Sequence, residues 1–265
     1  MVESFPTISS IMKNKLILLG NKALKIILPL IVILSIWELT AWKIGDNFFI
    51  PRVGETFEYL VEGVLSDSFF KTVFASLLRV LVGLFLGIFL GTVLATVCFK
   101  IGLLSTVFEP IISIMKATPV ACIIALLWIS FNPTQVAVLV VTLMVTPIIW
   151  QNVYEGYKSV DRQFVALCDS FQLGAVRRFK ELYAPYALSY LLPAIVTSIG
   201  LAWKAEVAME IMMENNIGMF IKQAKTSYET APTFAWTVVI ITLSIILEKT
   251  AKYFLGRIAN ELEIN

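Results

Sequence analysis

Residues 165–209 read VALCDSFQLGAVRRFKELYAPYALSYLLPAIVTSIGLAWKAEVAM. The first part of this stretch is polar and basic, and it leads through Pro185 into an apolar helix-forming run. Apolar runs of membrane length lie on both sides of the polar part, so its charged residues belong in water. The pattern predicts a soluble loop on a membrane protein, and we expect this loop to be available to a partner.

The composition of the whole chain indicates the same class of protein. Of its 265 residues, 58% are hydrophobic and 15% are charged, and the mean hydropathy is +0.83. Such a chain is too apolar for one soluble core and too long for a single membrane anchor. The net charge of +2 gives no reason to expect a nucleic-acid partner. We predict an all-α, polytopic transmembrane bundle in the cytoplasmic (inner) membrane, in contact with lipid.

Six apolar runs reach the roughly 17 residues that are needed to cross the hydrocarbon of a bilayer. They are residues 26–42, 73–99, 103–129, 135–154, 184–207 and 233–255. The third run is the least regular, because Pro119 interrupts it. With a cytoplasmic N-terminus, 13 of the 21 Lys and Arg residues fall on the cytoplasmic side, so both termini are predicted to be cytoplasmic.

The predicted domains are a cytoplasmic N-terminal segment (1–25), a transmembrane domain (26–255) with a cytoplasmic loop at about 155–183, and a cytoplasmic tail (256–265). The chain has no histidine, no phosphate-binding loop and no nucleophile elbow, so no catalytic residues are expected. Three cysteines without ligand-like spacing are interpreted as small packing residues. No metal site or cofactor is predicted.

A small residue recurs at every fourth position of the second run, in Gly83, Gly87, Gly91 and Ala95. Such a stripe lets another helix approach closely in lipid, where packing drives association. Packing within the chain is favoured over a contact between subunits.

Ionisable residues within the predicted spans are costly in hydrocarbon, so they are candidates for a transport pathway. They are Glu38, Arg79, Glu109, Lys116, Lys204, Glu206 and Glu210. Glu38 and Arg79 are expected to reach water from the span ends. Glu109 and Lys116 share one helical face, which predicts either an ion pair or a solute contact.

Glu206 and Glu210 also share a helical face, because they are four residues apart. Their charges repel unless a cation, a proton or a basic partner intervenes, and Lys204 of a second copy is one candidate. Both a role in the pathway or its gate and a role in an ion network at the membrane interface are open. The predicted path or gate residues are Glu109, Lys116, Trp128, Trp203, Lys204, Glu206 and Glu210.

The loop and the helix after it resemble the permease subunit of a binding-protein-dependent ABC importer, in the nitrate/sulfonate/taurine branch. The resemblance covers most of the chain and rests on the turn at 116–121, Trp128, Gly174-Ala175, the basic residues 177–180, Tyr183-Ala184-Pro185, Leu192-Pro193, Gly200-Leu201-Ala202-Trp203, Glu210 and Gly218. It implies two copies around a solute path, a separate ATP-binding subunit that hydrolyses ATP, and an external solute-binding protein.

In that family the loop carries a Glu-Ala-Ala pattern, then Gly and Leu-Pro, and forms a coupling helix that docks on the ATP-binding subunit. If Pro185 is aligned, the motif glycine falls on Gln172 and Glu-Ala-Ala on 166–168. If Gly174 is the motif glycine, Glu-Ala-Ala falls on 168–170, and neither register restores the glutamate. The contact residues that the resemblance implies are Phe164, Ala166, Cys168, Asp169, Gln172, Gly174 and Ala175.

Two other classes of transporter are considered. An ion-coupled secondary transporter would use Glu109, Glu206 or Glu210 to carry a proton or cation, but no internal repeat supports it. A channel would need a filter segment, and none is evident.

Overall fold

The structure, a computed structural model, describes residues 8–66, 69–213, 217–226 and 228–261, and this part of the chain is helical without strands. The helices are α1 (Ile8–Ile44), α2 (Val53–Leu65), α3 (Phe69–Lys100), α4 (Gly102–Ala117), α5 (Val120–Trp128), α6 (Pro133–Lys158), α7 (Arg162–Ser170), α8 (Ala175–Arg178), the π-helix η1 (Phe179–Tyr183), α9 (Ala184–Glu210), α10 (Ile217–Thr226) and α11 (Thr230–Glu261). Residues 1–7 and 262–265 of the predicted terminal segments lie outside the described residues.

Five helical stretches in the described part are long and apolar enough to cross a membrane, and α4 with α5 makes a sixth if the pair counts as one span. This pair is bent by 97° at Thr118-Pro119. Proline disfavours helix in the residue before it, so the helix ends there. The predicted all-α bundle of about six spans is confirmed, and so is the break in its third span.

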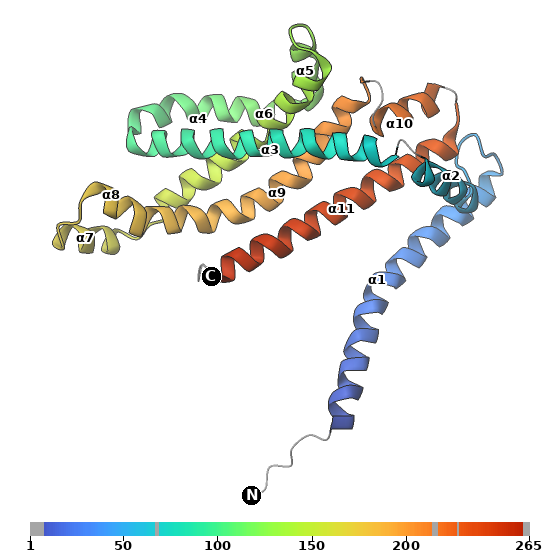
Figure 1. The fold of residues 1–265 in the computed structure, drawn as a ribbon, viewed down its shortest axis with the longest axis horizontal. Helices are drawn as coiled ribbons and strands as arrows, with labels where there is room; N and C mark the ends of the chain where they lie inside the picture. The colour runs from blue at the N-terminus through green and yellow to red at the C-terminus, as the bar shows by residue number, and fades with distance from the viewer. Residues whose placement is uncertain (1–7, 67–68, 214–216, 227, 262–265) are drawn as a thin grey trace, which may run out of the picture.

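The core is built on α6, which packs against both α3 and α9 (Figure 1). Gly83, Gly87 and Gly91, here called the glycine seam, lie against Val141, Val145 and Ile149 of α6. A Cβ on each glycine would lie 2.7, 2.7 and 2.8 Å from the Cβ of its partner. Only glycine permits this approach, and the contact is one between two helices of the same chain.

Helix α1 joins this bundle only near its C-terminal end (Figure 1). Trp37 Nε1 donates to the carbonyl of Pro51 at 3.0 Å, and the backbone N–H of Val53 donates to Glu38 Oε2 at 3.0 Å. Glu38 therefore holds the start of α2, which is a structural role.

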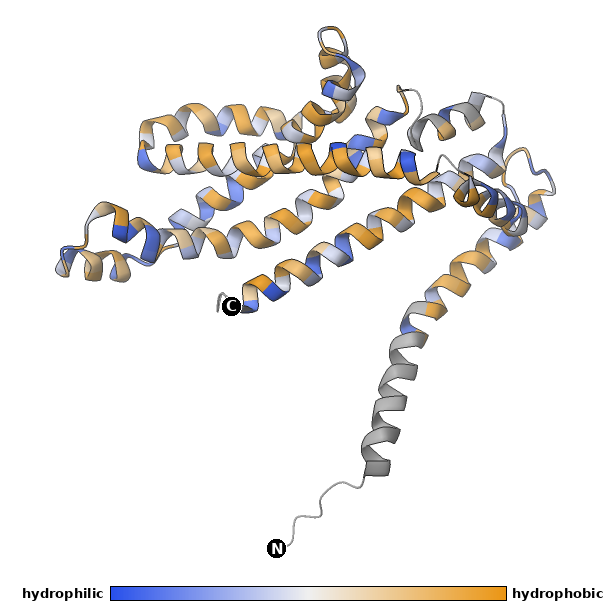
Figure 2. Ribbon diagram, viewed as in Figure 1, coloured by the Kyte–Doolittle hydropathy of each residue, from blue (hydrophilic) through white to orange (hydrophobic). Residues whose placement is uncertain are grey.

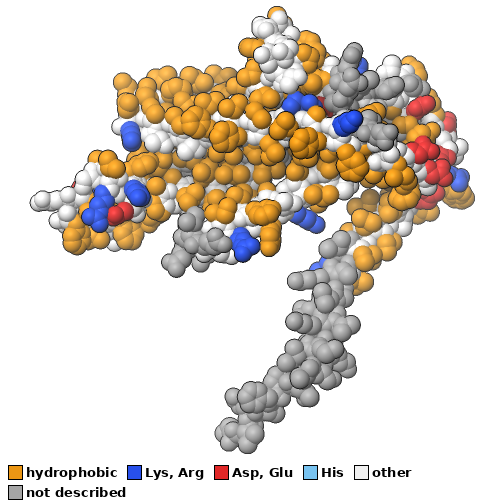
Figure 3. All heavy atoms as spheres, viewed as in Figure 1, with side chains coloured by type: hydrophobic (Ala, Val, Ile, Leu, Met, Phe, Trp, Pro, Cys, Tyr) orange, Lys and Arg blue, Asp and Glu red, His pale blue; other side chains and the backbone are white. Residues whose placement is uncertain are grey.

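The two ends of the bundle differ in charge. Figure 2 shows mostly apolar residues along α3 and α11, and Figure 3 shows acidic side chains gathered at the end that carries α2. Helix α2 contributes Glu55, Glu58 and Glu62, whereas the opposite end carries Arg177 and Arg178. This distribution supports the predicted placement of the α7 end in the cytoplasm, which stays a prediction.

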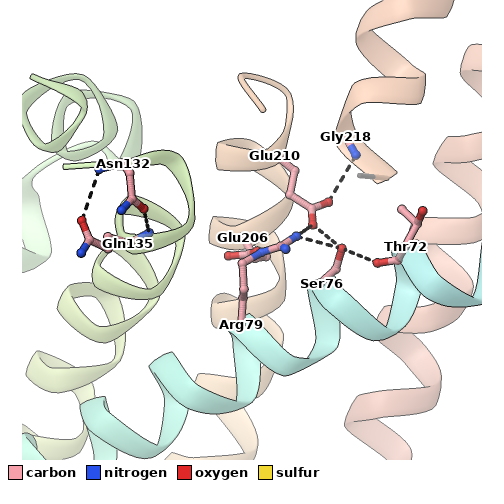
Figure 4. A network of polar contacts seen from close by, with 8 residues as sticks. All are labelled: Thr72, Ser76, Arg79, Asn132, Gln135, Glu206, Glu210 and Gly218. Carbon is pink, nitrogen blue, oxygen red and sulfur yellow. Dashed lines mark hydrogen bonds and ion pairs between the residues drawn. The ribbon is translucent and has the colours of Figure 1, made fainter. Parts of the chain in front are cut away.

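A capping box starts α6 and yields a first testable prediction. The Asn132 side chain accepts from the Gln135 N–H at 3.0 Å, and the Gln135 side chain accepts from the Asn132 N–H at 3.3 Å (Figure 4). Asn132→Ala is expected to lower the free energy of unfolding by about 1 kcal/mol, measured by thermal unfolding in detergent. Thr134→Ala, two residues away, is the control, and an equal loss there would contradict the capping role.

Candidate functional site

The polar loop forms the short helix α7, at the place where the family resemblance implies a helix. Asp161 caps its start by accepting from the Gln163 N–H at 2.8 Å. After its last residue the chain reverses at Gln172, whose φ of 49° lies in the left-handed region. Figure 1 shows α7 and α8 at one end of the molecule, beyond the ends of α6 and α9.

One face of α7 is apolar and uncovered. Phe164 and Leu167 of α7, together with Phe171 directly after its last residue, are here called the docking face, and they are 48%, 52% and 71% exposed. Of the predicted contact residues, Cys168 is half-buried, and Phe164, Ala166, Asp169, Gln172, Gly174 and Ala175 are exposed. Exposed aromatic and aliphatic side chains outside the spans favour a binding surface for a protein partner.

Contacts inside the loop connect α7 to the long helix that follows it. Arg178 Nη2 donates to Asp169 Oδ1, so Asp169 has a partner within the loop itself. The chain is helical without a break from Ala175 through η1 to Glu210. The docking face is therefore tied to the start of α9.

Aromatic rings fix the first turn of this long helix against its neighbours. The ring of Phe99, at the end of α3, lies 4.8 Å from that of Tyr157 and 4.9 Å from that of Tyr183. Phe179 packs on the other side of Tyr157, with 5.8 Å between ring centroids. These contacts join α3, α6 and η1 at the α7 end.

A buried charge cluster lies near the opposite end of α9, formed by Arg79 of α3 with Glu206 and Glu210 (Figure 4). Arg79 Nε donates to Glu206 Oε1 at 2.6 Å, and its Nη2 donates to Glu210 Oε1. The arginine side chain is 13% exposed, and both carboxylates are fully buried. The expectation that Arg79 reaches water is wrong, because the crossing of α3 and α9 brings it onto the carboxylates.

The cluster also corrects the choice of counter-charge. Arg79 of the same chain faces the two carboxylates, whereas the sequence offered Lys204 of a second copy as a candidate; the chain's own Lys204 is exposed on another side of α9. One guanidinium meets two carboxylates, and Oε2 of Glu206 has no hydrogen-bond partner among the described residues. The predicted ion network is thus present, but deep inside the chain.

Two more groups complete the shell of Glu210. Ser76 Oγ donates to Oε1 of Glu210, and the Gly218 N–H donates to Oε2 at 3.2 Å. Glu210 therefore joins α3, α9 and α10 (Figure 4).

Of the two alternatives for Glu109 and Lys116, the ion pair between them is wrong. Glu109 Oε1 lies 3.9 Å from Lys158 Nζ, and Lys116 Nζ donates to Gln151 Oε1. Both partners belong to α6, because α4 packs along that helix. Glu109 and Lys116 are exposed at separate points, so the structure does not bring them together with the charge cluster.

The two predicted tryptophans differ in environment. Trp203 is 1% exposed, and its Nε1 donates to the carbonyl of Ile240 at 3.2 Å. Trp128 lines a groove of about 790 Å³, here called the α10 groove. Its other lining residues are Ile211, Met212, Ile221, Lys222, Thr226 and Tyr228. Lys204 lines a different groove between α9 and α11, of about 470 Å³.

Comparison with known proteins identifies the family. The family described as "Binding-protein-dependent transport system inner membrane component" matches residues 83–260, more than half of the chain. The chain belongs to this family. It is a permease component of an ABC importer and a multi-pass protein of the inner membrane, and the secondary-transporter alternative is not favoured.

Two curated relatives are importer permeases. The permease is 32% identical over 127 residues to the bicarbonate transport system permease protein CmpB of Synechocystis sp.. The aligned region covers 46% of this chain and 45% of CmpB, so the match spans less than half of that relative. It is 26% identical over 231 residues to the formylaminopyrimidine transport permease protein ThiX of Halalkalibacterium halodurans, which covers 85% of this chain and 90% of ThiX.

Solved structures show the same fold. A chain of the inward-facing methionine ABC transporter MetNI superposes with a TM-score of 0.63 at 13% identity, over 73% of this permease and 99% of that chain. A chain of an amino acid ABC transporter described with histidines gives a TM-score of 0.56 at 14% identity, over 76% and 94%.

Sequence reasoning missed the partners of this permease's carboxylates, namely Arg79, Ser76 and Gly218. One signal was present: a single arginine in one apolar run and two carboxylates one turn apart in another are each costly alone in hydrocarbon. Pairing the two sites removes most of that cost.

Proposed function

We propose that a separate ATP-binding subunit docks on α7, that two copies of this permease enclose the solute path, and that an external solute-binding protein delivers solute at the opposite end. ATP hydrolysis is assigned to the docked subunit, since the chain has no phosphate-binding loop. The observation that carries this proposal is the exposed docking face on α7, outside the spans. An amphipathic helix of this kind binds by placing its apolar face in a groove of the partner.

The loop supplies a physical route from docking to transport. A partner that moves α7 also moves α9, because Asp169 is bonded to Arg178 and the helix continues unbroken to Glu210. The rings around Phe99 bring α3 and α6 into the same motion. Rigid-body displacement of packed helices is a common way to exchange access between two sides of a membrane. The path or gate roles of Glu109, Lys116, Trp128, Trp203, Lys204, Glu206 and Glu210 stay predictions.

Docking on α7 can be tested by making its apolar face acidic. The double change Leu167→Glu and Phe171→Glu is expected to weaken binding of the ATP-binding subunit by about tenfold or more, because two apolar anchors that docking would bury are lost. The measurement is co-purification of tagged permease with that subunit in mild detergent, followed by solute uptake in proteoliposomes.

Arg162→Glu is the matched control, because it adds negative charge to an exposed position on the opposite side of α7. It is expected to leave co-purification within about twofold of the unchanged permease. Full retention of the ATP-binding subunit by the double variant would exclude docking through this face.

A further inference from the structure

The start of α10 is pressed onto the end of α9. Gly218 is buried, and a Cβ at this position would lie 2.5 Å from both the Glu210 carbonyl carbon and the Ile211 nitrogen. These are backbone atoms that cannot move aside, so only glycine permits the contact. Helix α10 therefore takes its position directly from the last turn of α9.

A polar connection runs through the same point. One oxygen of Glu210 accepts from Gly218 of α10, and the other accepts from Arg79 and Ser76 of α3 (Figure 4). The guanidinium of Arg79 thus binds one oxygen of the Glu210 carboxylate, and the backbone N–H of Gly218 binds the other. Glu206, one turn earlier on α9, shares the arginine but forms no hydrogen bond with α10 within the described residues.

The position of α10 in turn shapes a groove. Besides Trp128 of α5 and residues that directly follow α9, the α10 groove is lined by Ile221, Lys222 and Thr226 of α10. Its volume of about 790 Å³ falls in the range of roughly 300–1,000 Å³ that is typical of small-molecule sites. On its other side α10 is held by Phe220, whose ring stacks on Trp236 of α11 at 4.3 Å. A shift of α10 relative to α5 would change the width of this groove.

We propose that Glu210, held by Arg79, is a positioning residue that makes α10, and with it one wall of the α10 groove, follow α9 during the transport cycle. The proposal rests on the proposed function for the source of the motion, since α7 lies at the other end of the same helical path. Beyond that function, it connects the motion of α9 to the α10 groove, whose volume is in the range of small-molecule sites.

Glu206 and Glu210 offer a matched pair of variants, because both are fully buried and bonded to the same arginine. In Glu210→Gln only one oxygen remains, so the side chain can accept from Arg79 and Ser76 or from Gly218, but not from both ends. Glu206→Gln makes the same chemical change one turn away and leaves the connection to α10 intact.

The position of α10 is measured by the distance between spin labels on cysteines at Ser130, just after α5, and Lys222. Cys122 and Cys168 are first replaced by serine, and Cys98 is buried. The assembled importer is compared without nucleotide and with ATP trapped, and solute uptake is measured on unlabelled protein. The labelled permease without a substitution in the charge cluster, and the labelled Glu206→Gln variant, are both expected to give a narrow distance distribution that shifts with ATP.

Glu210→Gln is expected to broaden this distribution, to abolish its shift with ATP and to lower uptake about tenfold, with the ATP-binding subunit still bound. The role of Glu210 would be overturned if the two variants gave the same label-distance distribution, or if the label distance in Glu210→Gln were unchanged. If Glu210→Gln does not fold, Gly218→Ala displaces α10 without changing any charge, and it must then broaden the distribution. Loss of the ATP-binding subunit from the unchanged permease would instead contradict the proposed function.

Discussion

Arg79→Gln is expected to lower the free energy of unfolding of this permease by about 3–5 kcal/mol, because it leaves Glu206 and Glu210 buried together without a counter-charge. No described residue other than Arg79 forms an ion pair with either carboxylate. The effect is measured as the midpoint of thermal or denaturant unfolding in detergent.

Two variants sharpen this first prediction. Lys252→Gln breaks an exposed pair with Glu248 and is expected to leave the free energy of unfolding almost unchanged, because water screens this pair. Arg79→Lys keeps the charge but cannot present separate nitrogens to the two carboxylates. Its free energy of unfolding is therefore expected to lie between that of Arg79→Gln and that of the unchanged permease. Equal stability of Arg79→Gln and Lys252→Gln would show that the buried cluster contributes nothing special to folding.

Gly87→Leu carries the second large effect. The new Cβ would lie 2.7 Å from the Cβ of Val145 and 3.2 Å from the Thr142 carbonyl, so α3 must move away from α6. We expect a loss of about 3 kcal/mol or more of unfolding free energy, at the upper end of overpacking effects, because α3 and α6 form the most extensive helix contact of the described core. The measurement is again unfolding in detergent.

Gly256→Leu provides the control for this second prediction. Gly256 also lies within a membrane-length helix, α11, but a Cβ there would meet no atom within 4 Å. We expect Gly256→Leu to cause no loss of unfolding free energy, since glycine has a low helix propensity and leucine a high one. A stable, well-assembled Gly87→Leu variant would mean that the seam is looser than its distances indicate.

The spans and α7 could be predicted because their signals are local. Hydropathy over about 17 residues marks a span, and the spacing of Phe164, Leu167 and Phe171 marks an amphipathic helix whatever surrounds it. Pro119 marks a break for the same reason, although the 97° angle depends on how α5 packs on α6 and α9.

The partners of the charged residues could not be predicted in the same way. Arg79 meets Glu206 across 127 residues of sequence, and nothing in either segment specifies how the helices cross. Helical spacing placed Glu109 and Lys116 on one face but gave no account of α6, which supplies partners for both. Sequence therefore indicated which residues are costly to bury, whereas the packing of α3, α6 and α9 decided how each is neutralised.

The glycine seam also limits which movements transport can use. Three glycines one turn apart receive three branched side chains, so sliding α3 along α6 by less than a full turn of about 5.4 Å would drive a valine against helical backbone. Such a fit forbids small axial slips and leaves α3 and α6 a single mechanical unit. We therefore expect a change of access between the two sides of the membrane to come from this unit moving against its neighbouring helices, or against a second copy, and not from slippage inside it.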